Sequence, residues 1–69
     1  MKDPQVVGGR YYNAYWKYEY TVIAKDGVWI TERMETPMQS NLGSPEQVGT
    51  IKRHCTAWDS RDRVIGLPK

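Results

Sequence analysis

The sequence contains one cysteine, one histidine and no phenylalanine, and these shortages exclude several classes of protein. A single cysteine cannot form a disulfide within the chain, so the disulfide framework of small secreted domains is excluded. Zinc sites need three or four ligands, which one histidine, one cysteine and scattered carboxylates do not supply, so no metal or other cofactor is predicted. No apolar run approaches the length of a membrane span or a signal-peptide core, which predicts a cytoplasmic protein with no membrane partner.

Neither sign of charge dominates, because ten Lys and Arg stand against eight Asp and Glu, a net charge of +2. A balance this weak does not by itself indicate nucleic-acid binding. With 69 residues, of which 39% are apolar, the chain predicts one small domain, residues 1–69, with a thin core. Association between copies of the chain would supplement such a core.

The apolar residues that are present alternate with polar ones, which is the period of a β-strand. Residues 16–24 alternate strictly, and residues 28–35 follow them after a Lys-Asp-Gly turn, so the pair predicts a β-hairpin. Further strands are predicted at 5–7, 48–57 and 63–67. The predicted core residues are Trp16, Tyr20, Val22, Ile30 and Ile51.

Two connections complete the predicted order of elements. Residues 36–47 contain two prolines and several small polar residues without any period, which predicts a long loop. Residues 58–62 predict one short helical turn before the last strand, because Asp59 can cap the backbone amides that follow it.

The hairpin register depends on which residues form its turn. A two-residue turn at 26–27 would place polar residues opposite apolar ones on both faces. A three-residue loop at 25–27, with its glycine in a bulge, pairs Val22 with Ile30 and matches every other pair as well, so we predict this loop. It places Trp29 on the outer face of the hairpin, where an aromatic side chain indicates a binding role.

This order of elements resembles the Src-homology-3-like small barrel, the shape that Tudor and KOW domains share. The tyrosine- and tryptophan-rich amino half and the segment HCTAWDSRDRV, residues 54–64, are similar to small proteins encoded by actinobacterial phages and plasmids. The resemblance covers most of the chain and implies an all-β, five-stranded small barrel with one short helical turn before the last strand. The chain lacks the acidic loop and ALYDY-type motif through which Src-homology-3 domains bind proline-rich peptides, so that specificity is not implied.

The adjacent His54 and Cys55 raise the question of a catalytic pair. Successive side chains of a strand point to opposite faces, so the two cannot meet as base and nucleophile. Cys55 is predicted on the inner face with Ile51, and His54 on the solvent face. Asp59 and Asp62 are predicted to cap a turn and to form surface ion pairs. We therefore predict no catalytic residues and no enzyme.

Binding is the remaining prediction, because residues 11–20 hold all five tyrosines and one of the three tryptophans, more rings than a small barrel can enclose. These tyrosines are expected either as exposed rings on the first connecting loop or as a cluster that packs over the barrel mouth. Together with the loop at 36–47, the residues predicted to bind a protein partner are Tyr11, Tyr12, Tyr15, Trp29 and Arg33.

A nucleic-acid-binding barrel is the alternative, in which aromatic rings stack on bases and basic side chains contact phosphates. The candidate residues for this role are Arg10, Lys17, Lys52, His54, Arg61 and Arg63. Acidic residues lie between them in the sequence and interrupt a continuous basic stripe. Protein binding is therefore the preferred prediction.

Overall fold

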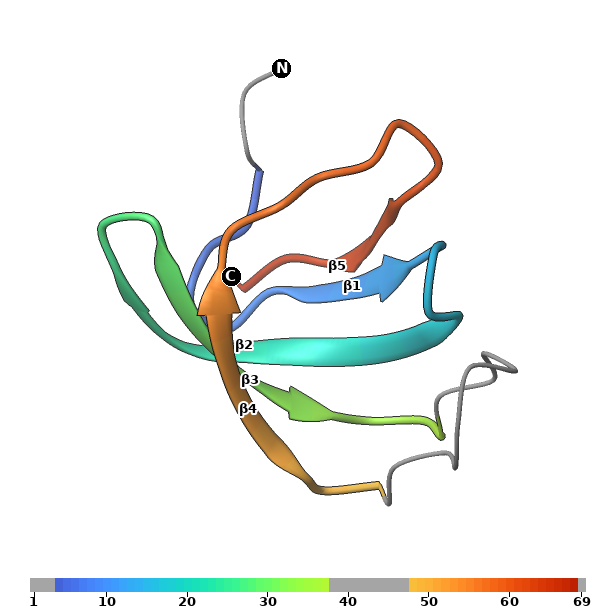
Figure 1. Ribbon diagram of the computed structural model, residues 1–69, viewed down its shortest axis with the longest axis horizontal. Coiled ribbons are helices and arrows are strands. Elements are labelled where there is room, and N and C mark those ends of the chain that lie inside the picture. The colour runs from blue at the N-terminus through green and yellow to red at the C-terminus, as the bar shows by residue number, and fades with distance from the viewer. Residues whose placement is uncertain (1–3, 38–47, 69) are drawn as a thin grey trace.

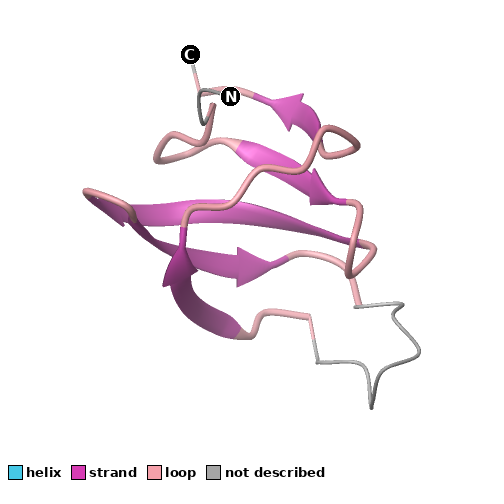
Figure 2. Ribbon diagram, turned by 45° about the horizontal axis from the view of Figure 1, so that its top comes forward, coloured by secondary structure: helices cyan, strands magenta, loops and turns pink. Residues whose placement is uncertain are grey.

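A computed structural model describes residues 4–37 and 48–68 and shows strands and loops without a helix in these residues (Figure 2). The strands are β1 (Arg10–Asn13), β2 (Tyr18–Asp26), β3 (Trp29–Met34), β4 (Ile51–Cys55) and β5 (Arg63–Gly66). They form one antiparallel sheet in the order β4-β3-β2-β1-β5 (Figure 1). The predicted all-β class with five strands is confirmed. No helix of the described residues is long and apolar enough to cross a membrane.

The connection between β4 and β5 covers residues 56–62 and ends in a tight turn at 59–62, and the predicted helical turn is not seen. Asp62 N donates to Asp59 O (2.9 Å), and Arg61 N donates to Asp59 Oδ1 (2.8 Å). Asp62 then uses its carboxylate to accept from Ala14 N (2.8 Å), which ties the turn to the β1–β2 connection. Because strand β5 begins at the next residue, there is no room for a second helical hydrogen bond.

The first strand of the sheet begins later in the chain than predicted. A turn lies between the residues predicted as that strand and β1. Gly9 N donates to Val6 O (3.0 Å), and Gly8 has φ of 89°. Residues 5–7 are therefore not a strand, and β1 is formed by the RYYN segment that was predicted as a connection. The predicted loop at 36–47 lies outside the described residues apart from its first two positions.

The β2–β3 hairpin turns at residues 27–28, so the predicted three-residue loop is wrong. Asp26 pairs with Trp29 across the turn. Gly27 has φ of 59°, which is typical of the first central residue of a type II′ turn. Such a turn matches the right-handed twist of the flanking strands without an extra residue.

The extra residue that shifts the hairpin register lies within β2 and not in the turn. The pairing changes between Val22 and Ala24, so Ile23 occupies a bulge. Val22 consequently lies opposite Glu32 and not opposite Ile30. Alternation in the sequence cannot locate this bulge, because the residues up to Val22 keep their face whichever residue they oppose.

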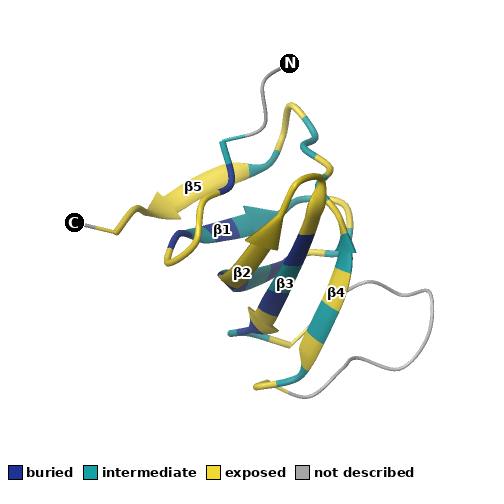
Figure 3. Ribbon diagram, turned by 90° about the vertical axis from the view of Figure 1, so that its left-hand side faces the viewer, coloured by how far each residue is buried: buried dark blue, intermediate teal, exposed yellow. Residues whose placement is uncertain are grey.

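The core lies on one face of the central strands, where the buried positions gather, whereas β5 is exposed along its whole length (Figure 3). The buried apolar residues are Tyr11, Tyr18, Tyr20, Val22, Ile30 and Met34. Trp16 and Trp58 are partly buried against this cluster. The prediction of Tyr20, Val22 and Ile30 as core residues is confirmed.

Two of the core tyrosines are anchored to the segment that precedes β1. Tyr11 Oη accepts from Val6 N (2.7 Å) and donates to Pro4 O (3.1 Å). Tyr20 Oη accepts from the side-chain amide of Gln5, which is itself buried. Burial raises the pKa of Tyr20 above its usual value, so the hydroxyl stays neutral. These bonds satisfy the polar ends of rings whose bodies form the core.

Strand β4 presents the opposite face to the one predicted. Ile51 is 54% exposed and Cys55 is also exposed, whereas Lys52 and His54 are half-buried on the inner side. The predictions of Ile51 and Cys55 as inner-face residues, and of His54 as a solvent-facing residue, are therefore wrong. The physical reason is the buried carboxylate of Glu32, which lies on the inner face of β3 and binds the His54 ring.

Candidate protein-interaction surface

The three tyrosines predicted to bind a partner occupy three different environments. Tyr11 is fully buried in the core, so its prediction as an exposed ring is wrong. Tyr12 is half-buried on the outer face of β1, opposite Glu19 on one side and Arg63 on the other. Tyr15 is 57% exposed in the β1–β2 turn. Alternation explains the difference between Tyr11 and Tyr12, because both lie in β1, where successive side chains point to opposite faces of the sheet.

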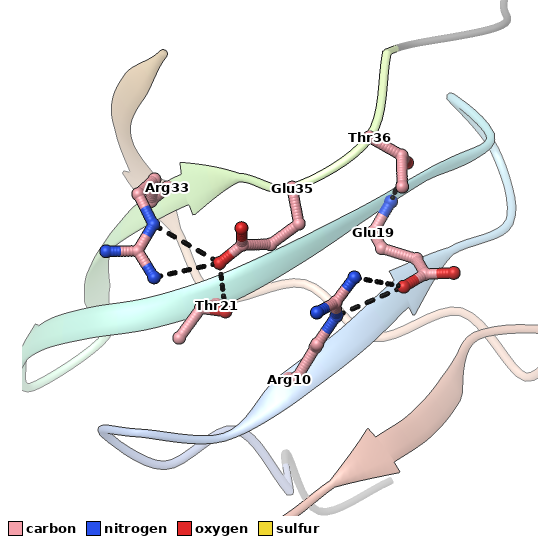
Figure 4. Close-up of polar contacts among 6 residues, drawn as sticks. All are labelled: Arg10, Glu19, Thr21, Arg33, Glu35 and Thr36. Carbon is pink, nitrogen blue, oxygen red and sulfur yellow. Dashed lines mark hydrogen bonds and ion pairs between the residues drawn. The ribbon is translucent and has the colours of Figure 1, made fainter. Parts of the chain in front are cut away.

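The outer face of the sheet carries two arginine–carboxylate pairs on neighbouring strands (Figure 4). Arg10 donates through Nε (3.1 Å) and a terminal nitrogen (2.8 Å) to Glu19 Oε1. Arg33 donates in the same way to Glu35 Oε2 (3.2 and 2.9 Å). The pairing of Glu19 with Arg33 implied by the predicted register is therefore not formed.

Glu35 is the more strongly held of the two carboxylates. Thr21 Oγ1 donates to Glu35 Oε2 at 2.6 Å, and this bond, supported by Arg33, lowers the pKa of Glu35. The group remains ionised over the neutral range, so the charge of Arg33 is largely compensated. Arg33 therefore acts mainly within this cluster.

Beside these pairs, β3 and β4 carry an exposed group that we call the β3–β4 face, formed by Trp29, Ile51, Arg53 and Cys55. The guanidinium of Arg53 lies 4.9 Å from the centre of a Trp29 ring, in the geometry of a cation–π contact. Trp29 is nevertheless 42% exposed, and it lies opposite Cys55 across the two strands. The predicted outward position of Trp29 is observed, although the predicted register is not.

Sequence reasoning missed Arg53 and Ile51 as members of this face, and one signal could have found them. The predicted inner face of residues 48–57 contained Arg53 between two apolar positions. A charged residue in the middle of an inner face indicates that the faces have been exchanged.

Strand β4 lies at one edge of the sheet, and some of its backbone N–H and C=O groups are not directed toward β3. Thr56 N donates to Val28 O (2.6 Å), and hydrogen-bonded pairs recur at every second residue of an antiparallel ladder. The N–H and C=O groups of Ile51 and Arg53 therefore point away from β3. No strand of the described residues lies on that side of β4.

The basic residues predicted to contact nucleic acid are distributed over several parts of the molecule. Lys52 lies on the inner side of β4, 5.4 Å from the centre of the Tyr18 ring. Arg61 is paired with Asp59 in the turn before β5 (3.0 Å). Of the others, Arg10 lies in β1, Lys17 in the β1–β2 turn, His54 on the inner side of β4 and Arg63 in β5. The structure does not bring these side chains together on one surface.

His54 takes part in a buried polar cluster with Glu32 and Tyr18. Tyr18 Oη donates to Glu32 Oε2 (2.5 Å), and His54 Nε2 lies 2.5 Å from Glu32 Oε1. His54 Nδ1 lies 2.8 Å from Cys55 O, and because a carbonyl only accepts, Nδ1 carries a proton. The hydrogen bond to Glu32 raises the pKa of His54, and partial burial opposes this effect.

This cluster has the chemistry of a buried ion pair between Glu32 and His54. Glu32 is fully buried, and Cys55 lies on the opposite face from His54. Among the residues that the structure describes, no group of three or more His, Cys, Asp and Glu side chains could hold a metal ion.

The comparisons with protein-family models, with curated proteins and with solved structures find no significant match. The class that the fold defines is a small, all-β domain built on one five-stranded antiparallel sheet.

Proposed function

We propose that the protein is a non-catalytic interaction module that binds an extended segment of a protein partner along strand β4. The observation that carries this proposal is that β4 is an edge strand of the sheet and that its exposed side chains belong to the β3–β4 face. An added strand would gain main-chain hydrogen bonds from the open edge and side-chain contacts from the face. A surface without an open edge would supply side-chain contacts alone.

The side chains of the β3–β4 face support a partner of definite chemistry. Tryptophan and arginine supply a large share of the binding energy in protein interfaces, and Trp29 and Arg53 already lie in a cation–π contact. In the described part of the chain, no carboxylate forms an ion pair with Arg53. The favoured segment carries an acidic residue opposite Arg53 and apolar residues over Trp29 and Ile51.

A second copy of this chain is a less favourable occupant of the same edge. Antiparallel pairing of two β4 strands about their central residue would place Arg53 directly opposite its own copy. Like charges directly opposite each other destabilise a β-pair. A different protein is therefore the favoured partner.

Nucleic acid is the alternative partner, and charge placement argues against it. Arg10, Arg33 and Arg61 each contact a carboxylate, so less of their charge is free for phosphates. Lys52 and His54 lie on the inner side of the sheet. Binding of a phosphate backbone requires a continuous positive stripe, which these side chains do not form.

The fold itself supports a related proposal, that of a Src-homology-3-like barrel. Strands β1 to β4 follow one another across the sheet, and β5 returns to lie beside β1. This order is similar to that of Src-homology-3-like barrels.

The test compares two substitutions of one residue, which distinguish the contribution of the backbone edge from that of the side chain. Ile51→Pro removes an N–H that points away from β3 and so blocks strand addition, while the ladder to β3 stays intact. Ile51→Ala removes only side-chain contacts. A partner captured from lysate by the wild type should be lost with Ile51→Pro and Trp29→Ala, weakened with Ile51→Ala and retained with Arg63→Ala on β5.

Two outcomes would contradict the proposal. Equal capture by the wild type and by folded Ile51→Pro would show that β4 is not the docking edge. Anisotropy titrations with labelled single- and double-stranded DNA and RNA provide the other test. Binding with a steep negative dependence on salt would assign the function to nucleic acid instead.

A further inference from the structure

A cavity lies away from the β3–β4 face, between the β1–β2 turn and the segment that follows β4. Its volume is about 360 Å³ and it opens to solvent. The lining residues are Asn13, Tyr15, Trp16, Ala57, Trp58, Asp59 and Asp62. Three aromatic rings and two carboxylates therefore share one small cavity, with no basic residue in its lining.

Hydrogen bonds hold the two walls of the cavity in a fixed relation. Asp62 accepts from Ala14 N (2.8 Å) through Oδ1 and from Asp59 N (3.1 Å) through Oδ2, so one carboxylate joins both walls. Within the turn, Asn13 Oδ1 accepts from Trp16 N (2.8 Å). A site formed in advance loses little entropy when a ligand binds.

The aromatic walls are anchored in the core on one side and exposed on the other. The Trp58 ring packs edge-on against the buried Tyr11 ring, with centroids 5.9 Å apart. The Trp16 ring makes a similar edge contact with Tyr15, with centroids 4.8 Å apart. Tyr15 remains largely exposed, so this side of the aromatic wall is open to solvent.

The charge in the cavity selects a cation. Arg61 lowers the pKa of Asp59 through its hydrogen bonds, so Asp59 is ionised in the neutral range. The carboxylate already accepts two guanidinium nitrogens of Arg61, at 3.0 and 3.2 Å. Asp59 thus shows the geometry with which it binds a guanidinium, and the Arg61 side chain that now occupies it is 66% exposed.

We propose that this cavity binds the guanidinium group of an arginine side chain from a protein partner. A guanidinium is planar and weakly hydrated, so it stacks on indole rings while its N–H groups donate to a carboxylate in the same plane. An ammonium group has no plane to stack and is more strongly hydrated. Arg61 acts as an internal competitor that shares Asp59 with the incoming group.

This site is separate from β4, and the probe used to test it does not use the edge of the sheet. The probe is N-acetyl-arginine-N′-methylamide, added to ¹⁵N-labelled protein, with the uncharged N-acetyl-citrulline-N′-methylamide as its isosteric control. The indole N–H signals report the site, because Trp16 and Trp58 line the cavity and Trp29 does not. A Trp29→Phe variant assigns the third signal.

Binding at the cavity predicts saturable shifts of the Trp16 and Trp58 signals with the arginine probe alone. Asp59→Asn, which keeps an acceptor for Arg61 N, should weaken binding about two- to fivefold, the size expected for one exposed charge pair. Arg61→Ala should strengthen it by a similar factor because the competitor is removed. Arg63→Ala, which removes the same charge outside the cavity, should leave it unchanged.

Several results would overturn the proposal. Equal shifts with the citrulline probe would show that charge plays no part. Shifts of all three indoles, a lack of saturation, or equal effects of Arg61→Ala and Arg63→Ala would show nonspecific attraction of a cation. Failure of this test would not affect the proposal of strand addition at β4, because that proposal is tested by Ile51→Pro.

Discussion

Replacement of His54 by alanine should destabilise the fold, because it removes a partner from a carboxylate that has no contact with solvent. Glu32 is fully buried, and breaking a fully buried ion pair costs about 3–5 kcal/mol. The His54 side chain is 37% exposed, so water can replace part of its contact, and we expect a loss of about 2–3 kcal/mol. A domain of this length has a total stability of about 3–10 kcal/mol, so the midpoint of thermal unfolding should fall by about 10–20 °C.

The pH dependence of stability gives the sharper form of this prediction. The hydrogen bond to Glu32 raises the pKa of His54 in the folded state above its usual value. The folded protein therefore binds a proton more tightly than the unfolded chain. The stabilisation is complete below the unfolded pKa of about 6.5 and is lost as the pH rises through the raised folded pKa.

The assay is urea unfolding followed by circular dichroism at several pH values from 6 to 9, under reducing conditions that protect Cys55. The difference in free energy of unfolding between the wild type and His54→Ala should shrink as the pH rises. Glu32→Gln keeps an acceptor for Tyr18 but removes the charge, so it should remove most of this pH dependence. Since His54 is the sole histidine, a difference that is independent of pH, or that grows with pH, would refute the protonated pair.

Three further substitutions test the fold by the same unfolding measurement. Trp29→Ala should cost at most about 1 kcal/mol, against about 3–5 for a core tryptophan, and a large loss would contradict its surface position. Ile51→Ala should cost about 0.5 kcal/mol or less, against about 2–5 for a buried isoleucine, and a core-sized loss would restore the inner-face prediction. Gly9→Ala should cost about 1–3 kcal/mol, because a Cβ at Gly9 would overlap the ring and hydroxyl of Tyr11; unchanged stability would show that the ring can move aside.

Much of the fold can be predicted from the sequence where a single local pattern determines the structure. Strict alternation assigns Tyr20 and Val22 to the inner face, and both are buried. The position of the hairpin follows from the same period and from the glycine in its turn. These features depend on local chemistry, which the sequence contains in full.

The errors arise where a distant contact overrides the local pattern. Strand β4 exposes Ile51 and turns His54 inward, because the buried carboxylate of Glu32 on the neighbouring strand binds the histidine ring. A rule that places apolar residues inside cannot foresee an acid in the core. The aromatic cavity is hidden for the same reason, because its walls meet through a contact between Ala14 and Asp62, which are distant in the chain.

The distribution of apolar side chains connects the thin core to the proposed binding surfaces. In the part of the chain that is described, six apolar residues are buried and eleven large ones are exposed, so burial does not account for most of them. Tyrosines fill much of the core, and their hydroxyls are tied down by hydrogen bonds, while Trp29 and Ile51 remain beside an open edge. Aliphatic and aromatic groups that add little to folding, gathered where backbone groups are also open, are the features expected of a docking strand. Loss of function without loss of stability, as predicted for Trp29→Ala, would show that these residues serve binding and not the fold.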